Sequence, residues 1–351
     1  MNLRNSAACA VLIAGAWTAA LAGSKDHTLD IYWVDSLGGG STLIVTPNDE
    51  SVLIDAGNPG GRDAGRIHEV ATKVAGLRRI DHLVVTHFHI DHFGGAAELA
   101  ALMPVGAVYD NGLPLTDPDG SQDPTWPQKS RAYREMKCDR RVVVAPGARI
   151  PLLSVNGGPA LTATFLAARE KFVGGTGPTA TATLPACQDP TPKAVDTSDN
   201  RNSVATLVQF GAFRFYDGGD MTWNTEAAMT CPVSRVGSVD VYQVNHHGLD
   251  VSNNPLLLRA LAPTVAVFNN GPRKGGSLPV VQTLQTLPSL RAIYQVHRNQ
   301  ATPEANGPAD QIANTDEAGG KWVRLSVAAD GATYTVNIPA TGHTASYQSR
   351  R

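Results

Sequence analysis

Four side chains that can bind a metal ion lie within six residues of one another, at His87, His89, Asp91 and His92. Imidazole and carboxylate groups are the ligands that zinc, manganese and iron take in hydrolytic sites. In a loop with this spacing, alternate residues can converge on one cation while the neighbouring pair binds a second. The motif therefore predicts a metal centre with one or two Zn²⁺ ions, or with Mn²⁺ or Fe. The alternative, a solvated polar turn, does not explain why three histidines and an aspartate cluster here.

The elements on either side of this loop are predicted to be a strand and a helix. Residues 82–85 form a short apolar run that leads directly into the loop, and a helix is expected to begin at Phe93 and continue to about Leu102. Other strands are expected at 28–35, 42–46, 51–54, 105–109, 203–210, 212–216, 239–244, 264–268, 291–296, 322–327 and 333–338. Other helices are expected at 62–75, 224–229 and 255–261.

The chain is expected to form one domain over residues 23–351. Residues near 110–140 are rich in Pro, Asp and Gly and are predicted to be a surface insert, and residues near 169–200 a long loop. β-rich halves with interspersed helices predict two sheets between layers of helices. The second sheet is expected to begin with the strands 141–144, 150–153 and 161–167.

The metal-binding loop, one segment before it and two segments after it resemble motifs of one known family. His-x-His-x-Asp-His over residues 87–92, followed by two glycines, resembles the signature of the metallo-β-lactamase superfamily. The supporting segments are Leu53 to Gly57, Gly219-Asp220 and His246-His247-Gly248, and the resemblance covers about Asp30 to Arg298. It implies an α/β fold, the αββα sandwich of two mixed sheets flanked by helices, with the metals at the edge of the sheets.

The resemblance also implies roles for single residues. Asp55 supports the metal loop from behind, although an Asp before Ala-Gly is also a common turn residue. Asp220 bridges two metals, although it could instead cap the helix expected near residue 224. Of His246 and His247, one binds the second metal and the other faces the substrate; the sequence leaves the choice open, and Gly248 favours His247 because glycine lets the backbone approach closely. The implied metal ligands are His87, His89, Asp91, His92, Asp220 and His247, and the implied catalytic residues are Asp91, His246 and Asp55.

One residue of the family pattern is missing. Most members with two metals have an additional His between the metal loop and the bridging Asp, and this chain has no His from residue 93 through residue 245. An Asn-rich turn, Asp199 to Val204, stands there instead. This turn, the late His-His-Gly and a strand leading to His297 are similar to the lactamase-like domain of DNA-uptake competence proteins (ComEC type) and to secreted phosphorylcholine-esterase-like hydrolases. The departure implies that the first metal is held more weakly than the second.

The implied activity is hydrolysis by a metal-bound hydroxide. A cation pair lowers the pKa of a bound water from about 15.7 toward 7, and His246 could stabilise the developing charge or protonate the leaving group. A phosphoester, most specifically a phosphodiester, is the expected substrate. One alternative substrate is a lactone or β-lactam. The late motif argues against this alternative, because it has His where many β-lactamases have Cys. Another is a non-catalytic surface binding protein that keeps the fold.

Several residues are candidates for contact with the substrate. Asn202 lies in the Asn-rich turn, and Arg273 and Lys274 follow the strand expected at 264–268. Gly38 to Gly40 lack the Lys and the helix of a phosphate-binding loop and are predicted to form a hairpin turn. Four residues of the insert are also candidates: Trp126, Arg131, Tyr133 and Arg134. For these four, and for Arg273 and Lys274, the preferred interpretation is an exposed surface residue, and contact with substrate is the alternative.

The N-terminal segment predicts export. Residues 1–22 carry Arg4, an apolar run and a small-x-small ending at Ala22, which is the pattern of a secretory signal peptide. The apolar run is short of the roughly 20 residues that span a membrane. We therefore expect a secreted or periplasmic protein with no transmembrane segment after cleavage.

Charge and cysteine content limit partners and cross-links. The formal net charge of −2 gives no field to hold extended nucleic acid, so a small anionic substrate is expected. Without the signal peptide, three cysteines remain, Cys138, Cys187 and Cys231. They permit one disulfide without fixing the pair, and unpaired thiols are the alternative. The sequence does not specify the oligomeric state.

Overall fold

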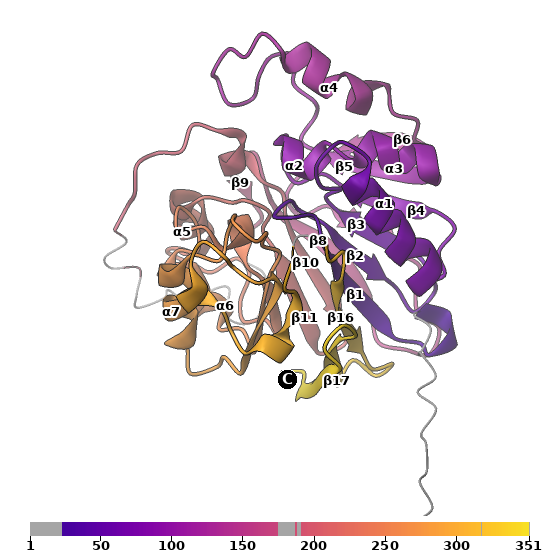
Figure 1. Ribbon diagram of the computed structural model, residues 1–351, viewed down its shortest axis with the longest axis vertical. Coiled ribbons are helices and arrows are strands. Elements are labelled where there is room, and N and C mark those ends of the chain that lie inside the picture. The colour runs from indigo at the N-terminus through magenta and orange to yellow at the C-terminus, as the bar shows by residue number, and fades with distance from the viewer. Residues whose placement is uncertain (1–22, 175–186, 188–190, 317, 351) are drawn as a thin grey trace, which may run out of the picture.

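The computed structural model describes residues 23–174, 187, 191–316 and 318–350. The predicted signal peptide and part of the loop predicted near 169–200 lie outside the described residues. Within them, the chain forms two sheets of nine strands each, with helices α1–α4 and α5–α7 on opposite sides of the pair (Figure 1). This arrangement confirms the predicted αββα sandwich of two mixed sheets.

The first sheet joins the N-terminal part of the chain to its C-terminal end. Its order is β18-β17-β16-β1-β2-β3-β4-β5-β6, parallel from β3 to β6 and antiparallel elsewhere. Its strands are β1 (Leu29–Val34), β2 (Thr42–Val45), β3 (Ser51–Ile54), β4 (Ile80–Val84), β5 (Val105–Asp110), β6 (Arg140–Val143), β16 (Trp322–Val327), β17 (Thr333–Ile338) and β18 (His343–Gln348). β1 to β3 are buried along their whole length, which explains their continuous β-branched and apolar runs.

The second sheet is built from the middle of the chain. Its order is β15-β14-β13-β12-β11-β10-β8-β7, with β9 paired to β8. β10 and β11 form the predicted antiparallel hairpin, and β11 to β15 run parallel. Its strands are β7 (Arg149–Ile150), β8 (Leu161–Ala168), β9 (Lys171–Phe172), β10 (Ala205–Phe210), β11 (Phe213–Asp217), β12 (Val241–Gln243), β13 (Val265–Phe268), β14 (Ala292–His297) and β15 (Ile312–Asn314).

Three apolar clusters hold the layers together. One lies between the sheets and takes side chains from both, such as Trp33 and Phe215, whose rings meet edge to face with centroids 5.7 Å apart. The other two lie between each sheet and its helices. On the first sheet these are α1 (Arg62–Glu69), which continues as a π-helical turn (Val70–Val74), α2 (Ile90–Phe93), α3 (Ala96–Leu102) and α4 (Trp126–Glu135). On the second sheet they are α5 (Trp223–Thr230), α6 (Pro255–Leu261) and α7 (Leu278–Gln285).

The assignment of residues 141–144 to the second sheet is wrong. β6 pairs in parallel with β5 at the edge of the first sheet, because the connection between them contains a helix and returns the chain to the same sheet as a crossover. β7 and β8 do belong to the second sheet, as predicted. Helices α4 and α7 and strands β15 and β18 are not predicted from the sequence. In the described part of the chain β18 pairs with β17 alone, and its residues alternate between partly buried and exposed.

The insert is anchored in the core rather than lying wholly on the surface. Trp126 and Tyr133 of α4 are only 4% and 1% exposed. Their rings pack on Phe93, with centroids 5.9 and 5.5 Å away, and Tyr133 also packs on Phe88. The interpretation of these two aromatic residues as exposed surface is therefore wrong, and their burial leaves neither free to contact substrate. Arg131 and Arg134, on the other side of α4, are exposed.

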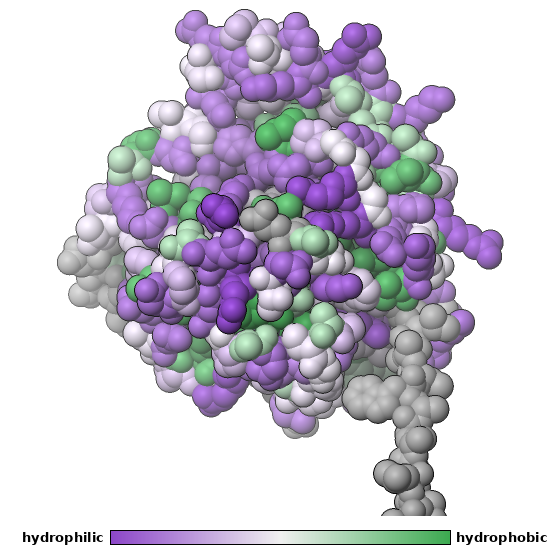
Figure 2. Space-filling model, in the orientation of Figure 1, coloured by the Kyte–Doolittle hydropathy of each residue, from purple (hydrophilic) through white to green (hydrophobic). Residues whose placement is uncertain are grey.

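One disulfide, the helix lengths and the distribution of surface hydrophobic residues relate to the predicted location of the protein. Cys187 and Cys231 form a disulfide, and Cys138 is unpaired. Among the described residues, no helix is long and apolar enough to cross a membrane. On the face drawn in Figure 2, hydrophobic residues form small scattered patches among hydrophilic ones.

A buried charged cluster links the two sheets near their common edge. Asp35, at the end of β1, is fully buried, and its Oδ1 accepts a hydrogen bond from His297 Nε2 of β14 at 2.6 Å. Its Oδ2 pairs with Arg66 of α1 at 2.8 Å. Burial alone would raise the pKa of the Asp35 carboxyl, but the hydrogen bond and charge of His297, with help from the Leu37 amide and Arg66, hold it below its ordinary value.

Replacing this carboxylate tests its contribution to stability. We expect Asp35→Asn to lower the free energy of unfolding at pH 7 by about 3 kcal/mol, because it leaves the Arg66 charge buried and unpaired. Since the folded-state pKa is depressed, the stabilisation is present above the unfolded value near 4 and is lost as the pH falls through the folded value. Urea unfolding from pH 7 to pH 3 should therefore show the two proteins converging at low pH.

An exposed ion pair provides the control. Glu69 and Lys73 form an i,i+4 pair whose side chains are 59% and 73% exposed, so Glu69→Gln should change the unfolding free energy by less than about 0.5 kcal/mol. A loss of similar size in both variants would contradict the assigned role of Asp35.

Candidate metal centre

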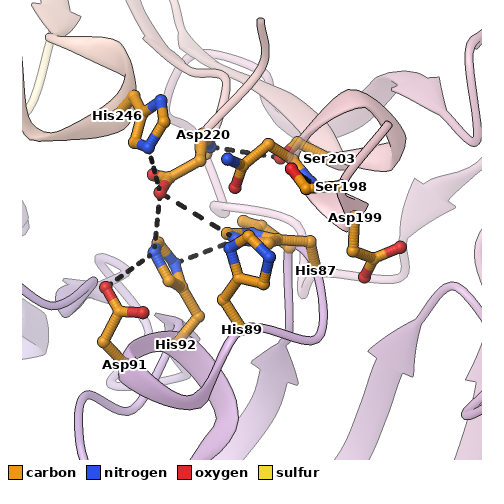
Figure 3. Close-up of polar contacts among 12 residues, drawn as sticks. His87, His89, Asp91, His92, Ser198, Asp199, Ser203, Asp220 and His246 are labelled. Carbon is orange, nitrogen blue, oxygen red and sulfur yellow. Dashed lines mark hydrogen bonds and ion pairs between the residues drawn. The ribbon is translucent and has the colours of Figure 1, made fainter. Parts of the chain in front are cut away.

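The carboxyl ends of parallel strands bring the predicted site residues together. The metal loop follows β4, and Asp55 follows its parallel neighbour β3. On the second sheet, Asp220 follows β11, and His246 and His247 follow the parallel strand β12. Parallel strands end at one edge of a sheet, so four separate segments meet there. Figure 3 shows imidazoles of the metal loop on one side of the Asp220 carboxylate and His246 on the other.

Asp91, His92, Asp220 and His247 form a four-residue group, each offering one ligand atom within 4.8 Å of the others. Asp220 Oδ2 lies 3.2 Å from His92 Nε2 and 3.4 Å from His247 Nε2. Asp91 Oδ2 lies 3.4 Å from each of the same two nitrogens. Atoms that ligate one zinc tetrahedrally at about 2.0–2.1 Å are about 3.3 Å apart. The spacing of the four-residue group therefore fits a bound cation.

His87, His89 and Asp220 form a three-residue group beside the first. His87 Nε2 lies 3.9 Å from Asp220 Oδ2, a wider spacing than in the four-residue group. Asp220 belongs to both groups, which is the position of a bridging ligand. The three-residue group has one ligand fewer, in agreement with the missing additional His.

Three buried ring nitrogens point to the same conclusion. Nε2 of His87, His92 and His247 is buried and has no hydrogen-bond partner in the described part of the chain. The Nδ1 atom of each ring is held, by Thr86 Oγ1 at 3.0 Å, Asp55 Oδ2 at 2.6 Å and the Asn269 carbonyl at 3.0 Å respectively. An unsatisfied buried polar atom costs about 1–3 kcal/mol. Ligation of a cation by these nitrogens would remove that cost.

The charges at the centre favour a cation. Burial alone would raise the pKa of the Asp220 carboxyl, but the charges of His247 and His92 hold it well below its usual range. Burial lowers the pKa of His92, yet Asp220 and Asp55 outweigh it and raise that pKa well above its ordinary value. Burial, helped by the His92 charge, lowers the pKa of His87 well below its ordinary value. The centre thus holds ionised carboxylates and takes up positive charge.

A strained turn places the two late histidines. His246 and His247 have φ of 53° and 54°, a left-handed conformation that residues with side chains rarely adopt. The buried carboxylate of Glu226 in α5 holds the turn, accepting hydrogen bonds from Asn245 Nδ2 at 2.7 Å and from the Asn253 amide at 3.0 Å. Burial raises the pKa of Glu226 to about 7.

The structure separates the two late histidines. His247 lies in the four-residue group, in line with the preference drawn from Gly248. His246 lies in neither group; its Nε2 is 3.4 Å from Asp220 Oδ2, and its Nδ1 is 3.0 Å from Ser252 Oγ. Gly248 itself allows a close approach to Phe268, since a Cβ there would lie 2.3 Å from that ring.

Asp55 stands behind His92 rather than among the ligand groups. Its Oδ1 accepts from the Thr86 amide and its Oδ2 from the Thr86 hydroxyl, both at 2.8 Å, while Oδ2 also binds His92 Nδ1. This fixes the ring so that its Nε2 faces the centre. Gly40, in the predicted turn between β1 and β2, lies against this pair: a Cβ there would be 2.7 Å from His92 Nδ1 and 2.8 Å from Asp55 Oδ2.

The three predicted substrate contacts have different surroundings. The Lys274 ammonium forms an ion pair with Asp91, so it reaches the centre directly. Arg273 is exposed. The side-chain Nδ2 of Asn202 donates a hydrogen bond to Asp199 Oδ1 at 2.9 Å and stabilises the short 3₁₀ turn Asp199–Asn202. Asn202 does not belong to a ligand group.

The groups that hold the outward-facing nitrogens of the histidines are not apparent from the sequence. Ser252 binds His246, the Asn269 carbonyl binds His247, and Asp119 binds His89 at 2.9 Å. These are single polar groups in separate loops, with no periodic pattern to reveal them. The one available signal was the concentration of Asp residues between 117 and 123 in the insert.

The comparison with protein families matches residues 35–189 to the model described as the metallo-beta-lactamase superfamily. The matched range includes the metal loop and Asp55. None of the curated proteins matches the chain significantly.

Several solved structures are similar at low sequence identity. A diphosphatase from the PhnP family is 12% identical, with a TM-score of 0.40 over 76% of this chain and 94% of its own. CmlA, a diiron beta-hydroxylase from Streptomyces venezuelae, is 17% identical, with a TM-score of 0.40 over 76% of this chain and 52% of its own. MEM-A1, a subclass B3 metallo-beta-lactamase isolated from a soil metagenome library, is 14% identical, with a TM-score of 0.38 over 77% and 84%.

The family match and the observed architecture agree. The match covers the segment that carries the His-x-His-x-Asp-His motif, and the two sheets flanked by helices place that motif at their edge. Residues 35–189 therefore form part of a metallo-β-lactamase superfamily domain, and the protein is a hydrolase of that fold with a candidate metal site.

Proposed function

We propose that the protein is an exported hydrolase that uses two metal ions to cleave a phosphodiester. The observation that carries the proposal is that two groups of ligands share the carboxylate of Asp220, with the Lys274 ammonium beside them at Asp91. Two cations and an ammonium form a compact positive anchor for a phosphate group. The net charge of −2 supports a small anionic substrate over extended nucleic acid.

Each residue of the centre has a distinct task in this proposal. Divalent ions bound there supply an activated water and polarise the phosphoryl oxygen. The four-residue and three-residue groups hold these ions, and Asp55 acts as a positioning residue that fixes His92. The Ser252 hydroxyl can donate to His246 Nδ1, which leaves the hydrogen of that ring on Nε2. His246 can then donate a hydrogen bond from this Nε2–H to the leaving oxygen and stabilise the charge that develops there.

The disulfide supports the proposed export. Disulfides form and persist in oxidising compartments such as the periplasm and the medium. The pairing of Cys187 with Cys231 fits such a location and agrees with the signal pattern over residues 1–22.

Metal content tests the two ligand groups. We expect the protein to bind two equivalents of Zn²⁺, the four-residue group more tightly because it has one ligand more. Asp220→Asn should weaken both equivalents, whereas His247→Ala should weaken only the tighter one. Competition with a chromogenic chelator and elemental analysis measure both. Asp330→Asn, an exposed aspartate elsewhere, is the control, and two equally tight equivalents in the unmodified protein would contradict this assignment.

Hydrolysis assays test the reaction. With added Zn²⁺ or Mn²⁺, we expect turnover of bis-p-nitrophenyl phosphate and a loss of at least about 10²-fold in kcat/KM for Asp91→Ala, equal to about 3 kcal/mol of transition-state stabilisation. A lactone and nitrocefin are assayed in parallel. Turnover of either of these in place of the diester would favour the carbonyl hydrolase, and no turnover of any of the three would favour a binding protein.

Lys274 provides a test of the anionic substrate. A hydrogen bond to a charged group contributes about 1.5–3 kcal/mol, so Lys274→Gln should raise KM for the diester about 10-fold and change KM for a neutral lactone little. Lys274→Arg should keep most of the affinity because it keeps the charge. Lys73→Gln, which removes an exposed lysine in the π-helical turn after α1, is the matched control. An unchanged KM for the diester in Lys274→Gln would show that this ammonium does not bind the phosphate.

A further inference from the structure

The insert between β5 and β6 reaches back to the metal loop through one carboxylate. Asp119 Oδ1 accepts a hydrogen bond from His89 Nε2 at 2.9 Å and another from the Asp199 amide at 2.8 Å. Asp199 Oδ2 in turn accepts from the amide of Phe88, the residue between the first two histidines of the loop, at 2.6 Å. Three hydrogen bonds thus join the insert, the Asn-rich turn and the metal loop in a closed ring.

His89 is oriented differently from the other histidines of the loop. His87 and His92 are held through Nδ1, and their Nε2 atoms have no hydrogen-bond partner among the described residues, whereas His89 is held through Nε2. A neutral imidazole carries one hydrogen, and an ionised carboxylate only accepts hydrogen bonds. The bond to Asp119 therefore places the hydrogen of His89 on Nε2 and leaves the lone pair on Nδ1 for a cation. The adjacent Nε2 of His87 is fully buried and, within the part of the chain that the structure describes, has no hydrogen-bond partner, so it could bind the same cation.

We propose that Asp119 is a positioning residue for the metal of the three-residue group: it fixes the tautomer and orientation of His89 and thereby sets the affinity of this group. The inference rests on the proposed metal centre. It assigns to the insert a task on the side of the centre where the additional His of the family is absent. Since this group has only three ligands, the orientation of each one affects its affinity strongly.

Other contacts of the insert hold the loop that carries Asp119 in place. α4 is anchored by Trp126 and Tyr133, which pack beneath the metal loop on Phe93. The loop before α4 is thus tied to the core at one end and to Asp199 at the other. Asp119 itself is 36% exposed, so it lies at the rim of the centre and not in its interior.

Zinc affinity and the state of the His89 ring test the proposal in the full chain. Loss of a carboxylate that orients a ligating histidine typically costs 10–100-fold in metal affinity. We expect this loss in the weaker zinc equivalent for Asp119→Ala, a smaller one for Asp119→Asn, and no change in the tighter equivalent. In the zinc-loaded protein, long-range ¹H–¹⁵N spectra should show the His89 hydrogen on Nε2 and its signal altered in Asp119→Ala.

Asp123→Asn is the matched control, since it removes the same charge from the same loop. Asp123 binds Thr125 and Lys129 and makes no contact with His89 among the described interactions. Circular dichroism and thermal unfolding of the chelator-treated variants verify that they fold. An unchanged weaker equivalent in both Asp119 variants, or a His89 hydrogen on Nδ1, would overturn the proposal.

The outcomes also separate this inference from the proposed function. Zinc affinity is measured without any substrate, so a protein that binds zinc as described but hydrolyses no phosphodiester would refute the proposed reaction and leave the role of Asp119 intact. A chain that binds no zinc would overturn both.

Discussion

The carboxylate of Asp220 is the group on which the centre depends. It is 3% exposed and lies within 3.4 Å of imidazoles from both sheets, at His92, His246 and His247. A buried charge is costly unless it is paired. Here the balance can be met either by protonating a neighbouring imidazole or by a cation, and the unpartnered Nε2 atoms favour the cation because they offer lone pairs rather than hydrogens. The outward hydrogen bonds of His87, His92 and His247 leave the lone pairs of their Nε2 atoms beside this carboxylate, where a cation would lie.

The architecture of the sandwich explains why such a centre forms at its edge. Each sheet has a run of parallel strands, and the carboxyl ends of both runs meet on one side. The backbone also joins the two edges directly, since the Val204 amide donates to the Thr86 carbonyl at 2.8 Å. Asp35 and His297 add a buried polar contact between the same two sheets. The ligands from the first sheet and those from the second are therefore held at a fixed separation by the core.

Much of this could be predicted from the sequence, and the failures share a cause. Strands β1 to β5, β16 and β17 of the first sheet follow from local runs, and the metal loop follows from a dense motif. The segments around Asp55, Asp220 and His247 follow from short strand-end motifs. The sheet to which β6 belongs depends on how the aromatic side chains of α4 pack, which no local pattern encodes. The contacts of Asp119 and Glu226 join single side chains to residues 30 and 19 positions away, respectively, so neither leaves a periodic trace. What sequence reasoning missed is the set of groups that orient the ligands.

The turn between β1 and β2 has a consequence for how the protein tolerates change. Gly40 has no side chain, and its α-carbon lies against the Asp55–His92 pair. Even one methyl group at this position would overlap with both residues. Gly40→Ala would alter neither the charge of the centre nor its set of ligands. It would act only by pushing apart the turn between β1 and β2 and the Asp55–His92 pair. Position 40 therefore has room for a hydrogen atom but not for a methyl group.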